Sequence, residues 1–171
     1  MKYNIIILFI AAVAFSCNSV DDLLKTSANY SVEQTANVDL IQDGPKTFSI
    51  TQEFATPADV DKFGSNLDAI EITGISMKFT NYTGTDVKIT DASLDFVGTG
   101  SSISINGEID LNAVNGAGAI DLDVTGIDFT AINAKFLTDK KISVKVAGTV
   151  NNVPVTFDVT FTIDIKVTGS I

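Results

Sequence analysis

The segment from Val155 to Val167 alternates without a break between apolar and polar residues. Successive side chains of a β-strand point to opposite faces, so this pattern gives a strand with one apolar face and one polar face. An α-helix would scatter the same apolar side chains around its circumference. A long strand that buries one face is typical of an antiparallel sheet with one side in water. The apolar face consists of Val155, Phe157, Val159, Phe161, Ile163, Ile165 and Val167.

Other segments share this two-residue period and are separated by residues that favour turns. Residues 142–146 alternate ahead of the long strand. Asn151-Asn152 then predicts a hairpin turn between the two, because asparagine tolerates positive φ. Residues 70–79 and 87–96 predict a second hairpin around the turn sequence NYTGTD.

Both strands of the second hairpin change the parity of their apolar residues partway along. The change falls at Gly74 in the first strand and between Ile89 and Ala92 in the second. One extra residue in a strand produces such a change, so a β-bulge is predicted in each. Shorter alternating segments follow over 103–111 and 119–124, separated by a loop of sequence NAVNGAG.

Two short helices are predicted between the strands. Thr56-Pro57 fits an N-cap followed by proline at the first helical position, and apolar residues recur near helical spacing over 60–70. A second helix is expected to begin near Asp128. Its apolar side would carry Phe129, Ile132 and Phe136.

Seven to nine strands with one apolar face each are best buried by packing two sheets together. The predicted fold is therefore all-β, an antiparallel β-sandwich that is Ig-like or related, with one or two short helices. It forms a single domain over residues 29–171. The order strand, short helix, strand, turn, strand is expected twice, over 48–96 and 120–165. Duplication of one unit and ordinary reuse of a common unit both explain this order.

The N-terminus has the features of a targeting signal. Lys2 supplies a positive charge, and Ile5 to Phe15 is an uncharged apolar run that ends just before Cys17, the single cysteine of the chain. The run is shorter than the roughly 17–25 apolar residues that span a bilayer, and it fits the apolar region of a signal peptide. A buried N-terminal helix or strand and an ordinary secreted protein with a free thiol are the alternatives.

The sequence AFSC at 14–17 resembles a bacterial lipobox, and the following CNSVDD resembles the acidic start of surface lipoproteins of the Bacteroidota. This resemblance implies cleavage after residue 16 and acylation of Cys17, which would attach the protein to the outer membrane at the cell surface. Residues 1–16 are then the signal peptide, and 17–28 form a flexible tether.

Charge and composition exclude several classes of function. The chain of 171 residues carries 21 acidic and 11 basic residues, a formal net charge of −10, and it has neither histidine nor tryptophan. Nucleic-acid binding depends on clustered cations, so no nucleic-acid partner is expected. Ser–His or Cys–His catalysis is excluded without histidine. Ser143 and Lys145 have the residue types of a Ser–Lys pair, but they lie two apart on a predicted strand and read as solvent-face residues. We therefore expect a protein that is not an enzyme.

Two candidate sites remain. Asp121 and Asp123 share one strand face and Asp128 follows a short turn, so loop oxygens could complete a calcium site. The alternative is an ordinary solvated acidic face, because alternate strand residues are roughly 6.6–6.8 Å apart. Tyr82 is expected at a turn tip as a contact residue, and its alternative is packing on its own hairpin. No other cofactor is expected.

These observations favour a lipid-anchored, non-enzymatic binding or adhesion module that meets an extracellular ligand. The alternative is a structural accessory subunit of a larger cell-envelope complex, with an envelope protein as its partner.

Overall fold

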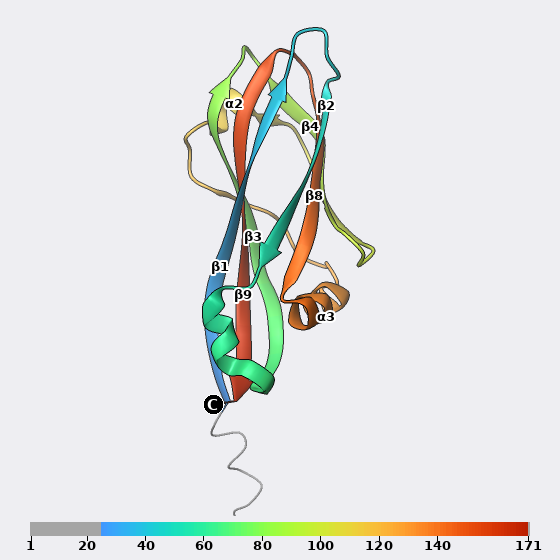
Figure 1. Ribbon diagram of the computed structural model, residues 1–171. Coiled ribbons are helices and arrows are strands. Elements are labelled where there is room, and N and C mark those ends of the chain that lie inside the picture. The colour runs from blue at the N-terminus through green and yellow to red at the C-terminus, as the bar shows by residue number, and fades with distance from the viewer. Residues whose placement is uncertain (1–24, 171) are drawn as a thin grey trace, which may run out of the picture.

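A computed structural model describes residues 25–170 and shows two antiparallel sheets packed face to face (Figure 1). This confirms the predicted all-β sandwich. Sheet A has the strand order β1-β9-β3-β7, and sheet B has the order β2-β8-β4-β5 with β6 also paired to β4. Sheet A contains β1 (Lys25–Leu40), β3 (Leu67–Thr83), β7 (Ile120–Asp121) and β9 (Val155–Ser170). Sheet B contains β2 (Thr47–Ala55), β4 (Lys88–Phe96), β5 (Ser101–Ile105), β6 (Ile109–Asp110) and β8 (Lys141–Val150).

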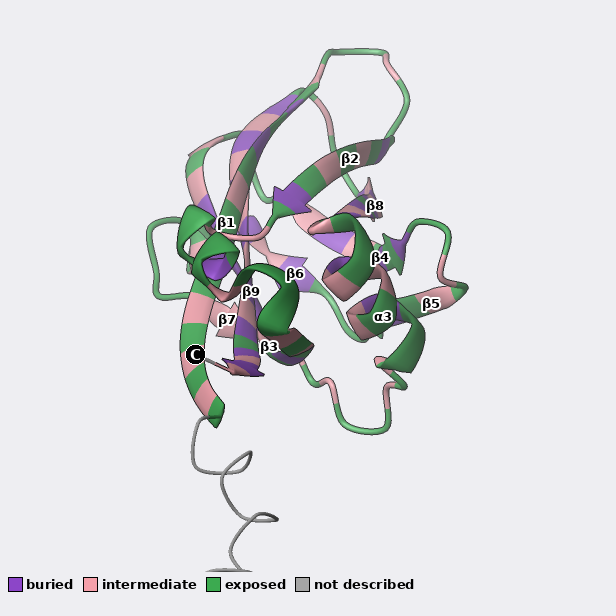
Figure 2. Cartoon of the chain, turned by 60° about the horizontal axis from the view of Figure 1, so that its bottom comes forward, coloured by how far each residue is buried: buried purple, intermediate pink, exposed green. Residues whose placement is uncertain are grey.

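The core lies between the sheets and follows the predicted alternation. All seven apolar residues on one face of β9 are buried, and Phe157, Ile165 and Val167 have no exposed surface. Figure 2 shows the same alternation as bands of different burial along the strands. Phe157 packs edge-on against Phe48 of sheet B with ring centres 5.7 Å apart, and it also contacts Phe79 of sheet A. Aromatic contacts across the layers therefore join the two sheets.

Both predicted bulges are confirmed. The pairing of β3 with β9 shifts between Ile72 and Gly74, and the pairing of β4 with β8 shifts between Thr90 and Ser93. Each shift restores the apolar residues to the core side after one extra residue.

Both predicted hairpins are wrong. β3 lies in sheet A and β4 in sheet B, and β8 and β9 likewise lie in different sheets. The turns around NYTGTD and at Asn151-Asn152 therefore cross from one layer to the other. Strands of both sheets turn an apolar face to the same core, so alternation alone cannot show whether the next strand stays in its sheet.

Three helical segments accompany the strands: η1 (Ala58–Asn66), α2 (Leu111–Val114) and α3 (Thr130–Asp139). α3 confirms the second predicted helix. η1 confirms a helical segment after Pro57, but it is a 3₁₀ helix that ends at Asn66, so residues 67–70 of the predicted helix belong to β3. Pro57 itself is at the N-cap position, and Thr56 does not cap the helix. α2 is a single turn that begins at Leu111, the last residue of the predicted segment 103–111, and continues into the NAVNGAG loop. The Asp110 carboxylate caps it by accepting a hydrogen bond from Asn112 N. In α3, Ile132 and Phe136 are fully buried. Asn133 Oδ1 accepts a hydrogen bond from Ile72 N, 3.1 Å away, and so joins this helix to β3.

The predicted repeat of element order is present, and its two units interlock. The predicted order is found in β2-η1-β3-β4 and again in β7-α3-β8-β9. The structure extends each unit by one earlier strand, β1 and β5, with β6 and α2 inserted in the second. The order β1-β9-β3-β7 of sheet A corresponds to the order β5-β4-β8-β2 of sheet B. Every pair of hydrogen-bonded strands joins one unit to the other, so neither unit forms a sheet on its own.

The domain begins earlier than predicted. β1 starts at Lys25, and residues 25–28 pair with the last residues of β9. The predicted tether at 17–28 is thus too long by four residues, because its polar end is the outward face of a strand. Cys17 and the predicted signal peptide lie outside the described residues. Within residues 25–170, no helix has the length and hydropathy needed to cross a membrane.

Candidate binding surface at the distal loops

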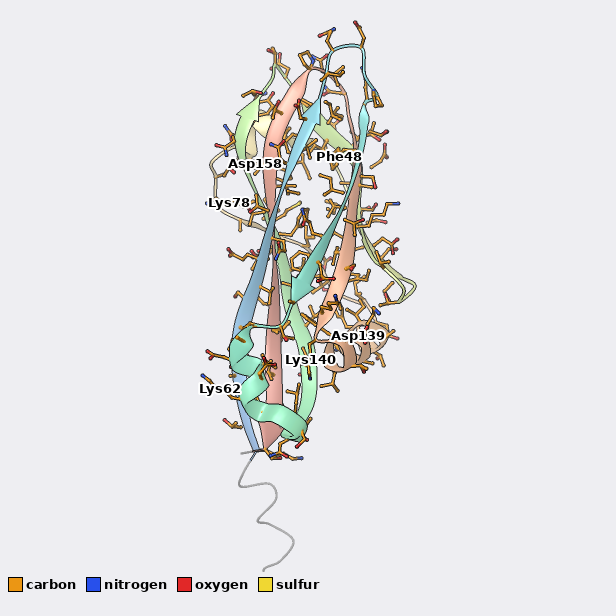
Figure 3. All side chains as sticks on the ribbon, viewed as in Figure 1. Phe48, Lys62, Lys78, Asp139, Lys140 and Asp158 are labelled. Carbon is orange, nitrogen blue, oxygen red and sulfur yellow. The ribbon has the colours of Figure 1, made fainter. Side chains whose placement is uncertain are left out.

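The sandwich is long, and its two ends differ (Figure 1). At the proximal end β1 begins, and η1 and α3 lie beside the strands. At the distal end three loops lie together: 41–46 between β1 and β2, 84–87 between β3 and β4, and 151–154 between β8 and β9. We call these three loops the distal platform. In Figure 3, Asp158 lies near the platform, and Lys62 marks the proximal end.

Asn151 connects all three loops of the distal platform. Its backbone oxygen accepts a hydrogen bond from Lys46 Nζ at 2.7 Å. Its side-chain Oδ1 accepts one from Lys88 N at 2.8 Å, and its Nδ2 donates to Asp86 O at 3.1 Å. Asn152 Nδ2 adds a bond to Thr85 O. Loops held in this way keep a fixed arrangement, which suits them to recognise a partner.

Tyr82, the predicted contact residue, folds onto its own turn. Its hydroxyl accepts a hydrogen bond from Val87 N at 3.2 Å, and its ring is half-buried. A Cβ added at Gly84 would lie 3.0 Å from this ring, so a larger residue there would have to displace the tyrosine slightly. Tyr82 N donates to Asn115 Oδ1. This arrangement matches the alternative interpretation, in which the side chain packs on its own hairpin.

The exposed apolar side chain of the platform is Ile41, which is 67% exposed. Its carbonyl accepts a hydrogen bond from Gly44 N at 3.1 Å, and this closes the turn that carries it. Asp43, in the same turn, has a φ of 61°. Sequence reasoning missed Ile41 because the loop has no alternation to mark it. An exposed apolar side chain on a fixed turn is suited to contact an apolar partner surface.

Two of the three aspartates of the predicted calcium site, Asp123 and Asp128, serve local turns. Asp123 accepts a hydrogen bond from Thr125 N and Asp128 accepts one from Thr130 N, each at 2.9 Å. The backbone and side chain of Thr125 lower the pKa of Asp123, and the side chain and backbone of Thr130 lower the pKa of Asp128. Asp121 is exposed on β7. Within residues 25–170, no three acidic or cysteine side chains form a group that could hold a metal ion. Calcium binding stays a prediction.

Asp158 is a further aspartate with a perturbed environment. On the outer face of sheet A, it accepts hydrogen bonds from Asn37 Nδ2 at 2.7 Å and Asn81 Nδ2 at 2.6 Å. Asn37 first and Asn81 second lower the pKa of this carboxyl. A general acid needs a raised pKa. The pKa values of Asp123, Asp128 and Asp158 are shifted the other way, so these carboxyls stay ionised and are not suited to act as general acids.

Sheet B has a polar groove of about 500 Å³ at its edge. It forms where β4 bulges and loop 106–108 separates β5 from β6. Lys88 Nζ lies 2.7 Å from Glu108 Oε2 beside it. The groove is lined by Thr90, Asp91, Ala92, Ser93, Ser104, Ile105, Asn106, Gly107 and Glu108. It interrupts the outer edge of sheet B.

No protein-family model matches the chain, and no curated protein matches it. Among solved structures, one of Desmodium yellow mottle tymovirus has a TM-score of 0.34 and 12% sequence identity to this chain. The match covers 84% of this chain and 90% of that one. A score this low says nothing about function.

Proposed function

We propose that the protein is a lipid-anchored, non-enzymatic binding or adhesion module on the outer surface of a Gram-negative outer membrane. Acyl chains on Cys17 hold it to the membrane, and the distal platform contacts an extracellular ligand or an envelope protein. One observation carries this proposal: β1 begins at the proximal end, and the platform lies at the opposite end (Figure 1).

The distance between the two ends suits this role. β1 has 16 residues, and a strand rises roughly 3.3 Å per residue, so β1 alone is about 50 Å long. A chain held at residue 17 would enter the domain at the proximal end of β1. The loops at the other end of this strand would then stand well clear of lipid headgroups.

The anchor is tested by Cys17→Ser. Each buried acyl CH₂ contributes roughly 0.8 kcal/mol, so removing the lipid is expected to move the protein from the membrane fraction to the soluble fraction. Incorporation of a labelled fatty acid should be lost as well. The far-UV circular dichroism of the released protein should be unchanged, because the described fold begins at Lys25. Retention in the membrane together with unchanged acyl labelling would refute the anchor.

The outward orientation is tested with Gln42→Cys, an exposed platform residue. A membrane-impermeant maleimide should label this variant on intact cells. The wild-type protein is the control, since its single cysteine is expected to be acylated and unreactive. Labelling that appears only after the outer membrane is permeabilised would place the platform on the inner side and overturn the surface assignment.

The accessory-subunit alternative is favoured by the outer edge of β1, which has no backbone partner among residues 25–170. Solubilisation in mild detergent separates the two functions. A structural subunit should purify with another envelope protein in fixed stoichiometry, whereas the proposed binding module should purify without one. Ile41→Ser then tests the platform: binding to whole cells or to solubilised envelope proteins should fall, while the melting temperature stays constant.

A further inference from the structure

The outer edge of β1 is unpaired and regular. β1 pairs with β9 from Lys25 to Leu40 with no register shift. No backbone hydrogen bond joins it to any other described segment. Its side-chain hydrogen bonds also go to β9, as from Asn37 to Asp158 and between Thr35 and Thr160. The other side of the strand therefore offers a row of backbone N–H and C=O groups to a partner.

The remaining sheet edges are much less suited to strand addition. β2 has nine residues, β5 has five and β7 has two. The edge formed by β5 and β6 is further interrupted by loop 106–108 and its groove. Natural proteins protect free edges with short strands, bulges, proline or inward-pointing charges. β1 has 16 residues and contains neither proline nor glycine. Its only protection of this kind is charge, from Lys25, Glu33 and Asp39 on its outer face.

The residue pattern of β1 suits pairing with a second copy of itself. When two strands pair, side chains on the outer face must lie opposite side chains on the outer face. In antiparallel self-pairing of β1, two registers meet this condition over nearly the whole strand. One pairs Lys25 with Asp39 of the second copy, and the other pairs Thr26 with Leu40.

Charge decides between the two registers. The Lys25–Asp39 register places a cation opposite an anion at both ends of the paired strands, and it puts Glu33 opposite Ser31. The second register places Glu33 opposite Glu33 of the other copy, and like charges directly opposite are destabilising. All of these side chains lie on the outer, exposed face of β1.

We infer that two copies of this protein associate through their β1 edges, antiparallel and in the Lys25–Asp39 register. The pairing joins two copies of sheet A into one continuous sheet with an unbroken polar outer face. The two N-terminal ends then leave the paired strands in opposite directions, about 50 Å apart by the rise of a strand. Two copies that stand upright on their lipid anchors therefore pair in this way from facing membranes.

Charge reversal tests the register in the mature protein purified in detergent. Lys25→Asp and Asp39→Lys each place like charges opposite at both ends, so each should raise the dimer dissociation constant about tenfold. The double variant Lys25→Asp with Asp39→Lys should restore the wild-type value. Lys166→Asp is the matched control, because Lys166 is an exposed lysine one strand away on β9. Sedimentation over a dilution series measures the constants.

Cysteine substitution provides a second, independent test. The double variant Ser31→Cys with Glu33→Cys should form a disulfide-linked dimer, because the thiol at position 31 of one copy lies opposite the thiol at position 33 of the other. Glu33→Cys alone should remain monomeric on a non-reducing gel. A cross-link from Glu33→Cys alone would show the rejected register and overturn the assignment.

Three other results would overturn the inference. The wild-type protein could stay monomeric up to high concentration, with amide exchange of β1 independent of concentration. A dimer could form whose dissociation constant is unchanged by either charge reversal. An unrelated protein could copurify in fixed stoichiometry and protect the β1 amides, which would assign this edge to a different partner. Cys17→Ser fractionation and Gln42→Cys labelling are unaffected by these outcomes, so the proposed function is judged separately.

Discussion

The two ends of the sandwich bury the inner face of sheet A in different ways. At the distal end it packs on sheet B, through Phe157, Phe48 and Phe79. Towards the proximal end helices contribute: η1 contacts β9, and α3 contacts β3 and β8. The inner face of a long sheet must be covered along its whole length, and a helix can cover it where the facing sheet ends. Where two sheets pack together, backbone hydrogen bonds to neighbouring strands hold the strands of each sheet in place. A helix packed on a sheet can shift when its side-chain contacts change.

The largest effect is expected from removing an aromatic side chain at the distal end. Phe157→Ala should lower the free energy of unfolding by about 3–5 kcal/mol, since the cavity lies between two sheets that cannot close it. Phe136→Ala, in α3, is the matched variant at the proximal end. Phe136 and Phe157 are equally buried, so the two variants differ only in what surrounds the cavity. The loss for Phe136→Ala should fall at the lower end of that range. Urea unfolding followed by circular dichroism measures both. A larger loss for Phe136→Ala would contradict the comparison.

A smaller effect is expected from glycines in close contact at each end. A Cβ at Gly169 would lie 2.5 Å from Phe63 Cδ1 and 2.7 Å from the backbone oxygen of Asn66. Gly169→Ala should therefore destabilise the protein by about 1–3 kcal/mol. At the distal end, the atoms nearest to a Cβ at Gly148 all belong to side chains, chiefly that of Phe48 at 2.8 Å. Because side chains can move aside, Gly148→Ala should destabilise the protein less than Gly169→Ala. Thermal unfolding measures the stability of both variants. An equal loss of stability in Gly169→Ala and Gly148→Ala would show that η1 moves aside freely.

The next pair of variants, Asn133→Ala and Asn151→Ala, separates the stability of the whole fold from that of the distal platform alone. Asn133→Ala leaves Ile72 N without its partner between α3 and β3, and a part-buried unpaired amide costs about 1–3 kcal/mol. The variant should lower the urea midpoint. Asn151→Ala should mainly loosen the distal platform and raise amide exchange at Lys88, with little change in the midpoint. A fall in the midpoint as large as that of Asn133→Ala would show that the platform is part of the cooperative core.

The smallest effect is expected in acid. Asp158 at the distal end and Asp128 at the proximal end both have a lowered pKa in the folded protein. Such a carboxyl stabilises the fold above its unfolded pKa of about 3.9 and loses this contribution as the pH falls through its folded pKa. Asp158→Asn and Asp128→Asn should therefore each make stability less dependent on pH below about pH 4. Urea midpoints measured over that pH range test this expectation. If the midpoint of either variant depends on pH as steeply as that of the wild type, the pKa of that aspartate is not lowered by folding.

Much of the fold follows from local pattern. Alternation predicted the strands from β2 onwards but not β1, whose first residues were assigned to the tether. The parity changes at Gly74 and between Ile89 and Ala92 predicted both bulges, because side-chain direction depends only on neighbouring residues. The assignment of strands to sheets did not follow, since a turn such as Asn151-Asn152 serves a hairpin or a crossing equally well.

The candidate surface was less predictable than the fold. Asn151 was recognised as a turn residue, but its bonds reach loops more than sixty positions away in sequence. Ile41 was missed for the reason given above, whereas the packing of Tyr82 on its own turn was one of the two interpretations that the sequence allowed. The bonds that fix these loops depend on long-range contacts, which no local window contains.

The interlocked units have a consequence for the order of events during synthesis. Because each ladder joins the first unit to the second, no part of either sheet can pair until β5 has left the ribosome, and sheet A stays incomplete until β9 follows. Such distant pairing slows folding. Until β5 has emerged, the nascent chain has no strand partner and stays unfolded, and an unfolded chain is the state in which a protein can be threaded through a narrow export channel.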